Sequence, residues 1–178
     1  MKKIYLLFLF CSIAAVSFVS CTKSSTSETS YDKKSYVEVC GLKWATKNVG
    51  ATKDNPYGNL YAYEQALKAC PDGWRLPTSD ELEQLSLFYS VPVSYDGMNG
   101  MWFSGSTPYK DGVDAVFLPM AGGSFHGSKQ NPGESANYWS STVYPYAMCI
   151  YVLCFDGSSL DLDGNDRSDE CSVRCVKN

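Results

Sequence analysis

Cysteine is the residue type with the widest chemistry in this chain of 178 residues. Its eight copies stand at positions 11, 21, 40, 70, 149, 154, 171 and 175. Thiolates bind zinc or copper, act as nucleophiles and form disulfides. No pair has the Cys-x-x-Cys spacing of a zinc site, and the single His126 offers few nitrogen ligands. We therefore expect neither a structural zinc site nor a cofactor.

The first of these cysteines belong to an export signal. Met1-Lys2-Lys3 precedes an apolar run from Ile4 to Val19, which is short beside the roughly 20 residues that span a bilayer. The run ends in Phe18-Val19-Ser20-Cys21, which resembles the bacterial lipobox and implies lipidation of Cys21 and cleavage before it. Ordinary cleavage near Ser20, leaving a free thiol at Cys21, is the alternative.

These features divide the chain into three parts. We expect residues 1–20 to be a lipoprotein signal peptide, residues 21–35 to be the lipidated cysteine with a flexible Ser/Thr-rich tether, and residues 36–178 to be one domain without a linker or an internal repeat. With Cys11 removed and Cys21 lipidated, six cysteines remain in an exported domain. That number favours disulfides, but spacing alone does not choose among the possible pairings.

The charge of the chain limits its partners. The formal charge is −4, and removal of Lys2 and Lys3 with the signal leaves thirteen basic against nineteen acidic residues, a net −6. An acidic domain is poorly suited to nucleic acid or to an anionic membrane surface. The membrane contact that we expect is the lipid anchor alone.

Aromatic side chains in Gly- and Ser-rich loops between residues 92 and 147 are the candidate binding residues. Such rings give a large contact area at a low cost in conformational entropy, which suits a sugar or a protein ligand. The predicted ligand-binding residues are Tyr95, Trp102, Tyr109, Phe125, Tyr144 and Tyr146. The alternative is that these rings pack beneath their own loops.

Two further patterns could carry chemistry. Residues 159–170 alternate acids with Gly and Asn, like a calcium loop, but Asp166 stands where an EF-hand needs Gly and Ser172 where it needs Glu. We expect a solvated acidic turn there. No Ser/His/Asp set, P-loop or pair of carboxylates stands out, and His126 is isolated, so the sequence predicts no catalytic and no metal-binding residues.

The elements that position these residues are two helices followed by a run of strands. Apolar spacing predicts a helix over residues 60–69, and Thr78 with Glu81 forms a capping box for a second helix that ends at Val91-Pro92. Residues 48–59, 94–112 and 124–137 have the composition of loops. Strands are predicted at 36–40, 42–45, 114–120, 137–142, 147–155, 159–162 and 171–177. The order of elements favours an α+β fold.

Five motifs occur in a fixed order: Leu42–Gly50 (LKWATKNVG), Ala69–Thr78 (ACPDGWRLPT), Leu118–Gly122 (LPMAG), Tyr138–Thr142 (YWSST) and Ser172–Val176 (SVRCV). Together they resemble the Fibrobacter succinogenes major paralogous domain, which is common in lipoproteins of Bacteroidetes and Fibrobacteres. That family is similar to the C-type-lectin-like fold and to the formylglycine-generating sulfatase-modifying factor. The resemblance implies two helices beside a small twisted antiparallel sheet, with the terminal strands close together, and no established activity.

The resemblance also bears on the cysteines. Cys70 and Cys175 belong to the family's common pattern, and a bridge between them would close a loop of about 105 residues. The other four cysteines are additional to that pattern, and we expect Cys154 to pair with Cys171, which leaves Cys40 with Cys149. The conspicuous Trp74, Leu76 and Trp139 are expected in the core. Arg75, facing Glu81 or a carbonyl, and Arg174 are expected in structural roles.

An enzymatic alternative comes from the same resemblance. Cys149 and Cys154 have the spacing of the copper-binding cysteine pair of the sulfatase-modifying oxidase, but apolar residues surround them, and on a regular strand the two sulfurs would face opposite sides. We therefore expect no enzyme. The leading hypothesis is a non-catalytic binding or adhesion module for a glycan or a protein, anchored in the cell envelope at the outer membrane. A structural component of an envelope or fimbrial assembly is the first alternative and the copper-thiol oxidase the second.

Overall fold

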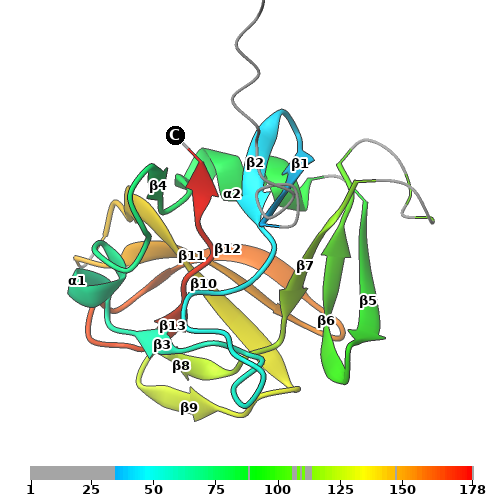
Figure 1. Cartoon of the computed structure of the whole chain (residues 1–178). Helices are drawn as coiled ribbons and strands as arrows, with labels where there is room; N and C mark the ends of the chain where they lie inside the picture. Colours follow the sequence, from blue (N-terminus) through cyan, green and yellow to red (C-terminus); the bar gives the residue numbers. More distant parts are fainter. Residues whose placement is uncertain are drawn as a thin grey trace, which may run out of the picture.

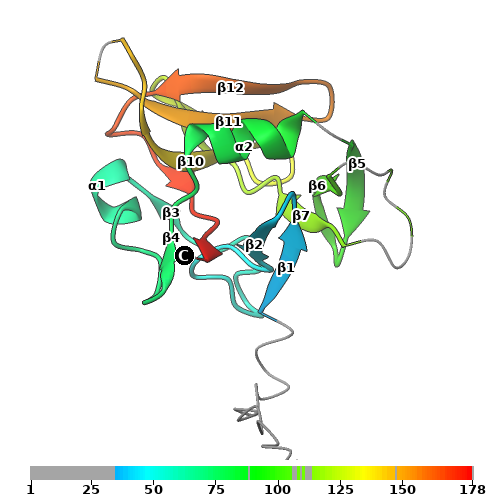
Figure 2. The same ribbon diagram turned by 90° about the horizontal axis from the view of Figure 1, so that it is seen from above.

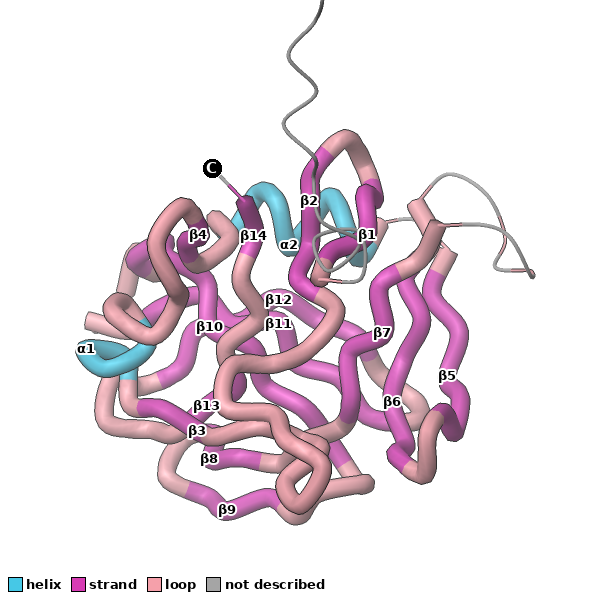
Figure 3. Tube along the Cα trace, viewed as in Figure 1, coloured by secondary structure: helices cyan, strands magenta, loops and turns pink. Residues whose placement is uncertain are grey.

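The computed structural model describes residues 35–177, except residues 88, 106, 107, 109, 111–113 and 147. Strands and loops make up most of the trace, and two short helices accompany them (Figure 3). The helices are α1 (Tyr63–Ala66) and α2 (Ser79–Ser86). The strands are β1 (Tyr36–Val39), β2 (Leu42–Ala45), β3 (Leu60–Tyr61), β4 (Trp74–Arg75), β5 (Ser90–Tyr95), β6 (Met98–Phe103), β7 (Val116–Pro119), β8 (Gly123–Phe125), β9 (Ser128–Gln130), β10 (Ser135–Val143), β11 (Ile150–Asp156), β12 (Leu160–Asn165), β13 (Cys171–Ser172) and β14 (Val176–Lys177).

A five-stranded sheet in the order β12-β11-β10-β13-β3 forms the centre of the domain (Figure 1). Its strands run antiparallel except for the parallel pair β10–β13. Neighbouring residues of β10 point to opposite faces of the sheet. Tyr138 therefore packs with one core cluster and Trp139 with the other, and both are at most 1% exposed. The sheet is thus buried on both faces.

Helix α2 covers the face of this sheet that carries Tyr138 (Figure 2). The helix begins at Thr78, whose hydroxyl accepts a hydrogen bond from the Glu81 amide while the Glu81 carboxylate accepts one from the Thr78 amide. This is the predicted capping box, which satisfies two amide donors that a helix start leaves unpaired. Leu82 and Leu85 lie on the buried side of the helix and are 0% exposed.

A second sheet, in the order β1-β2-β14-β4, joins the two ends of the domain. Strand β14 pairs with both β2 and β4, so the first and last strands are close together, as expected. A disulfide between Cys70 and Cys175 links the segment after α1 to the residue before β14. This bridge was predicted and is confirmed.

Three hairpins share one kind of turn. Their two-residue loops are Cys40-Gly41 between β1 and β2, Asp96-Gly97 between β5 and β6, and His126-Gly127 between β8 and β9. In each loop both residues have a positive φ, between 48° and 75°. This conformation matches the twist of paired strands, and glycine adopts it without strain.

The sequence predictions missed two of these hairpins, β5–β6 and β8–β9. Residues 94–112 and 124–137 were predicted as loops, but they contain β6 with part of β5, and β8 with β9. Helix α2 ends before Val91-Pro92, which lie in strand β5 instead. The helix predicted over residues 60–69 is limited to one turn, because β3 takes its first residues and turns follow Ala66.

Other elements agree more closely with the sequence. The strands predicted at 36–40, 42–45, 114–120, 137–142, 147–155 and 159–162 correspond to β1, β2, β7, β10, β11 and β12. The strand predicted at 171–177 is broken into β13 and β14, with Arg174 between them. The domain is mostly β, with two short helices and several antiparallel sheets. Within the described residues no helix is long and apolar enough to cross a bilayer.

The two additional disulfides were predicted wrongly. Cys154 lies opposite Asn137 on β10, and β13 with Cys171 runs along the other side of β10. Strands on either side of a common neighbour are about 9.5 Å apart, which exceeds the roughly 7 Å that a disulfide can span between Cα atoms. The order of the strands therefore keeps Cys154 and Cys171 apart.

Cys40 and Cys149 are also not joined, and they lie in turns that connect strands of two different sheets. Cys40 lies in the β1–β2 turn, where its thiol is 4.0 Å from the carbonyl oxygen of Gln84 on α2. Cys149 lies in the turn between β10 and β11, where its carbonyl accepts a hydrogen bond from the Tyr144 amide. The signal peptide, Cys21 and the tether lie outside the described residues.

Candidate functional site

A cleft of about 650 Å³ lies between the β5-β6-β7 sheet and the segment that follows β2. Its volume falls in the range of typical small-molecule sites, roughly 300–1,000 Å³. The described residues that line it come from five parts of the chain. They are Val37, Thr46, Lys47, Asn48, Ala51, Thr52, Lys53, Pro56, Tyr95, Asp96, Met98, Trp102, Ala115, Val116, Phe117, Pro119 and Arg174.

The alternation of side chains along β5, β6 and β7 builds the first wall of the cleft. Met101 and Phe103 of β6 point into the core, together with Leu118 of β7. The alternate residues of these strands point away from the core, and the register places Trp102 opposite Phe117 and Tyr95 opposite Met98 on that outward face. The face that would usually be polar on a sheet with one buried side is therefore aromatic and apolar.

Three rings of this wall contact one another, and we call them the aromatic wall: Tyr95, Trp102 and Phe117. The ring centroids of Tyr95 and Trp102 are 4.9 Å apart, and both lie 5.2 Å from the Phe117 centroid. Edge-to-face pairs at this spacing hold each ring in a fixed orientation. Phe117 is buried, whereas Tyr95 is 50% exposed. Phe117 is therefore the inner ring of the wall, and Tyr95 is its solvent-accessible outer ring.

Gly100 allows this packing. An added Cβ at Gly100 would lie 2.5 Å from the Phe117 ring and 2.6 Å from the Leu118 carbonyl oxygen. No side chain fits in that space, so the Phe117 ring lies directly over the backbone of β6.

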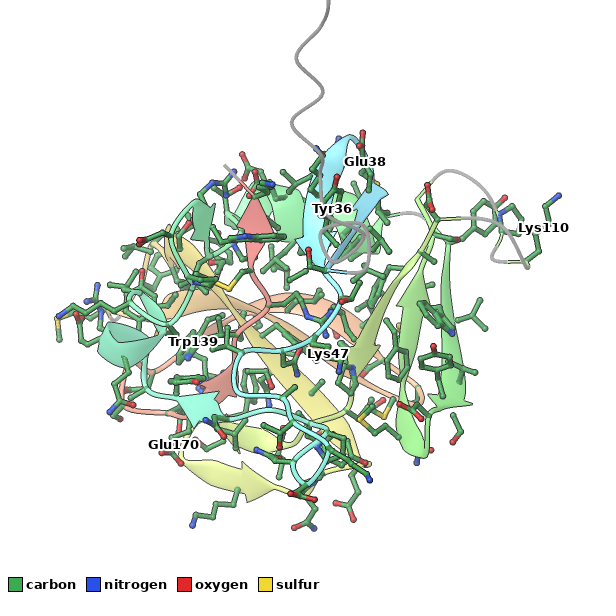
Figure 4. The ribbon with its side chains drawn as sticks, viewed as in Figure 1. Tyr36, Glu38, Lys47, Lys110, Trp139 and Glu170 are labelled. Atoms are coloured by element: carbon green, nitrogen blue, oxygen red, sulfur yellow. A yellow bond between two sulfur atoms is a disulfide. The ribbon has the colours of Figure 1, made fainter. Side chains whose placement is uncertain are left out.

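The opposite wall is the segment from Thr46 to Pro56. It is fixed by the Val49 amide, which donates to the Val173 carbonyl, and by the Asn55 side chain, which donates to the Gly58 carbonyl and to Asn59. Lys47 and Lys53 are exposed on this segment and line the cleft. Lys47 lies on the side of the segment that faces β7 (Figure 4).

The base of the cleft is a buried polar network around Arg174, which is 1% exposed. Its Nε and Nη2 donate to Asn48 Oδ1 at 2.9 and 2.7 Å, and its Nη1 donates to the Ala45 carbonyl at 2.7 Å. The Asn48 amide group donates to the Tyr138 hydroxyl, which donates to the Pro119 carbonyl. The network ties the two walls together beneath the cleft.

Burial shapes the ionisation of this network. Desolvation lowers the pKa of Arg174 to about 10, because a buried cation lacks the hydration that it has in water. Desolvation raises the pKa of Tyr138 to about 12, so its hydroxyl is neutral at physiological pH. Arg174 is therefore a buried cation whose hydrogen-bond partners are uncharged.

The six predicted ligand-binding residues do not form one site. Tyr95 and Trp102 line the cleft. Tyr144 and Tyr146 lie in the β10–β11 turn, with ring centroids 6.0 Å apart, and Phe125 ends β8, where it contacts His126. The β10–β11 turn lies close to helix α1, because Arg167 donates both to the Met148 carbonyl in the turn and to the Glu64 carboxylate on the helix. Helix α1 and strand β5 lie at opposite ends of the domain (Figure 1). Tyr109 lies outside the described residues.

The residues of the five sequence motifs mostly build the scaffold. Arg75 and Glu81 form a two-pronged ion pair, with both N–O distances at 2.7 Å, and Arg75 also donates to the Leu76 carbonyl. Hydrogen bonding from Arg75 holds the pKa of the Glu81 carboxyl below its usual range. Trp139 lies inside the domain, where its indole donates to the Tyr61 carbonyl (Figure 4). Trp74 is only half-buried.

The cysteine pair of the oxidase alternative does not fit a copper site. Cys149 precedes β11 and Cys154 lies five residues further along that strand, so their Cα atoms are about 16 Å apart at the rise of an extended strand. Burial, together with Asp163 and Asp161, raises the pKa of the Cys154 thiol to about 12. A protonated thiol is a poor ligand for a soft metal, and the two sulfurs cannot share one ion.

The acidic stretch from 159 to 170 is strand β12 followed by a turn. Asp166 accepts hydrogen bonds from the amide and hydroxyl of Ser168, and Asp169 accepts from the Gly127 amide. Within the described part of the chain, no group of three or more His, Cys, Asp or Glu side chains is placed to hold a metal ion.

Sequence reasoning missed four kinds of cleft residue: the two lysines, Asn48, Phe117 and the base residue Arg174. The two lysines and Asn48 come from one segment, but Phe117 and Arg174 are far from it in the sequence, and no local pattern connects the three regions. The Asp96-Gly97 turn was the one signal that could have indicated the β5–β6 hairpin and the alternating wall.

Comparisons of this chain with protein-family models, with curated proteins and with solved structures give no match.

Proposed function

We propose that this domain is a non-catalytic binding module that holds a glycan in the cleft between the aromatic wall and the Thr46–Pro56 segment. The observation that carries the proposal is the outward face of the β5-β6-β7 sheet, which presents Tyr95 and Trp102 to a cleft rather than to the core. Aromatic rings with one accessible face bind the apolar faces of sugar rings, and fixed rings lose little entropy on binding.

The shape of the site favours a glycan over a protein. A protein partner typically buries about 800 Å² on each side of a broad interface. The cleft is concave, about 650 Å³ in volume, and combines an apolar wall with hydroxyl, amide and ammonium groups. Apolar walls with a few fixed polar groups are typical of small-ligand sites.

The setting of the module follows from the sequence and is part of the proposal. A lipid on Cys21 and the tether to residue 35 would display the domain from the cell envelope at the outer membrane. The resemblance to the Fibrobacter succinogenes major paralogous domain, and through it to the C-type-lectin-like fold, is compatible with a mostly β domain whose terminal strands pair in one sheet.

The test is a glycan array with the full-length chain purified in mild detergent, followed by calorimetric titration of the glycans that bind. Tyr95→Ala should weaken binding about 30-fold, the effect of removing a central aromatic anchor worth about 2 kcal/mol. Tyr146→Ala is the matched control, because Tyr146 is 74% exposed and lies in the β10–β11 turn, outside the cleft. Absence of any bound glycan, or equal losses in the two variants, would contradict the proposal.

A structural component of an envelope assembly is the second candidate, and strand β5 favours it. This strand lies at the edge of its sheet; Val91 within it is 42% exposed, and Tyr89 just before it is 49% exposed. Exposed edges can add a strand from another chain. Pro92 in the middle of β5 lacks an amide donor, which weakens such pairing. A stable partner that cross-links to β5, in a protein that binds no glycan, would support this candidate.

A further inference from the structure

The cleft gathers positive charge on an acidic protein. The chain carries a net charge of −4, yet three cations, Lys47, Lys53 and Arg174, line the cleft. Among the described residues that line it, Asp96 is the only acid. A concave site with cations and a low-dielectric wall concentrates an attractive field for anions.

These cations lack anionic partners within the described part of the chain. The ion pairs there are Arg75–Glu81 and Arg167–Glu64, so no described carboxylate lies within 4.0 Å of the cations in the cleft. The lysines of the Thr46–Pro56 segment are therefore not engaged in the internal ion pairs that commonly neutralise surface lysines.

Arg174 is a buried cation with no anionic partner among the described residues. A buried cation that is paired only with neutral dipoles loses hydration without gaining a full countercharge. Its hydrogen-bond partners are Asn48, the Ala45 carbonyl and the Tyr138 hydroxyl, all of which are neutral. An anion at the base of the cleft would supply the countercharge that these neutral partners do not, and would stabilise the buried cation.

We infer that the cleft selects an acidic glycan, with its sugar ring against Tyr95 and Trp102 and its carboxylate or sulfate toward Lys47, Lys53 and Arg174. This inference rests on the proposed glycan-binding function and adds the chemical class of the ligand. The aromatic wall supplies affinity for the ring, and the cationic side supplies selectivity for charge. Carboxylates and sulfates both accept hydrogen bonds from Lys and Arg.

The experiment compares matched pairs of oligosaccharides on the full-length chain. Uronate-bearing and sialylated probes are each paired with their methyl esters, and sulfated probes are paired with the desulfated forms. We expect the charged member of at least one pair to bind about tenfold more tightly, since two partly exposed charge contacts contribute up to about 1 kcal/mol each. The preference should decrease as salt is raised.

Variants assign the preference to the cleft. Lys47→Gln together with Lys53→Gln should remove most of the preference for the charged probe and leave only the part that Arg174 contributes, while binding of the neutral probe is retained. Lys68→Gln is the matched control, because Lys68 is an exposed lysine after α1 that does not line the cleft. The lysine variants avoid the folding defect that substitution of the buried Arg174 would bring.

The outcomes separate the inference from the proposed function. Equal binding of charged and neutral probes, both weakened by Tyr95→Ala, overturns the charge selection and leaves the glycan site in place. A charge preference that is undiminished in the double lysine variant also overturns the inference. Failure to bind any probe, charged or neutral, overturns the proposed function itself and the inference with it.

Discussion

Removal of the Cys70–Cys175 bridge should cost this domain a large part of its stability. The two cysteines are 105 residues apart in the sequence, and the bridge closes the part of the domain that follows α1 into one loop. In the chain-entropy model a loop of this length contributes about 4.7 kcal/mol, and measured losses for native disulfides are about 2–5 kcal/mol. Typical domains have only 5–15 kcal/mol in total.

The loss of stability should affect the sheet that joins the two ends of the domain. Cys175 directly precedes β14, the strand that holds β2 and β4 together, and Cys175 is 2% exposed. The double substitution Cys70→Ala and Cys175→Ala should therefore lower the free energy of unfolding by about 3–5 kcal/mol. Urea denaturation of the full-length chain, followed by tryptophan fluorescence, measures this change.

Reductant provides the matched control for the same measurement. Reduced wild-type protein should unfold like the double variant, and reductant should leave the variant unchanged, because Cys154 and Cys171 are not joined. A loss below about 1 kcal/mol would refute the loop-closure argument. A further loss on reduction of the variant would refute the strand order that separates Cys154 from Cys171.

Three further predictions concern single residues. Glu81→Gln should lower the free energy of unfolding by about 1 kcal/mol near neutral pH. Because the folded-state pKa of Glu81 is lowered, the difference between variant and wild type should be complete above the unfolded-state pKa and should vanish as pH falls through the folded-state pKa. A difference that does not depend on pH would contradict this prediction. Gly100→Ala should displace Phe117, lower stability by about 1–3 kcal/mol and change the near-ultraviolet circular dichroism, while Gly157→Ala, with nothing within 4 Å, should change neither. Tyr138 should resist ionisation to about pH 12 in a spectrophotometric titration, and ionisation of every tyrosine near pH 10 in the folded protein would contradict its burial.

Local chemistry accounts for the parts of the fold that the sequence predicted. Thr78 and Glu81 lie three residues apart, so their mutual capping can be recognised without knowledge of the tertiary structure. The β1–β2 hairpin was likewise predicted from alternation around Gly41. The hairpins at Asp96-Gly97 and His126-Gly127 use the same turn chemistry, but the surrounding Gly, Ser and Asp residues made these regions resemble loops.

Strand order accounts for what the sequence could not show. A parallel neighbour, β13, lies on the far side of β10 from β11, and this arrangement separates Cys154 from Cys171. Nothing near either cysteine in the sequence encodes that order. The cleft depends on the same kind of information, because Lys47, Tyr95 and Arg174 come from distant segments.

Arg174 shows why scaffold and binding residues cannot be fully separated in this domain. The sequence favoured a structural role, and its bonds to Asn48 and to the Ala45 carbonyl confirm one. The same side chain reaches the base of the cleft. A buried cation held by neutral groups is fixed in position and incompletely neutralised, and a site for an anion needs both properties. The network that orders the chain after β2 therefore also sets the charge that the proposed ligand would meet.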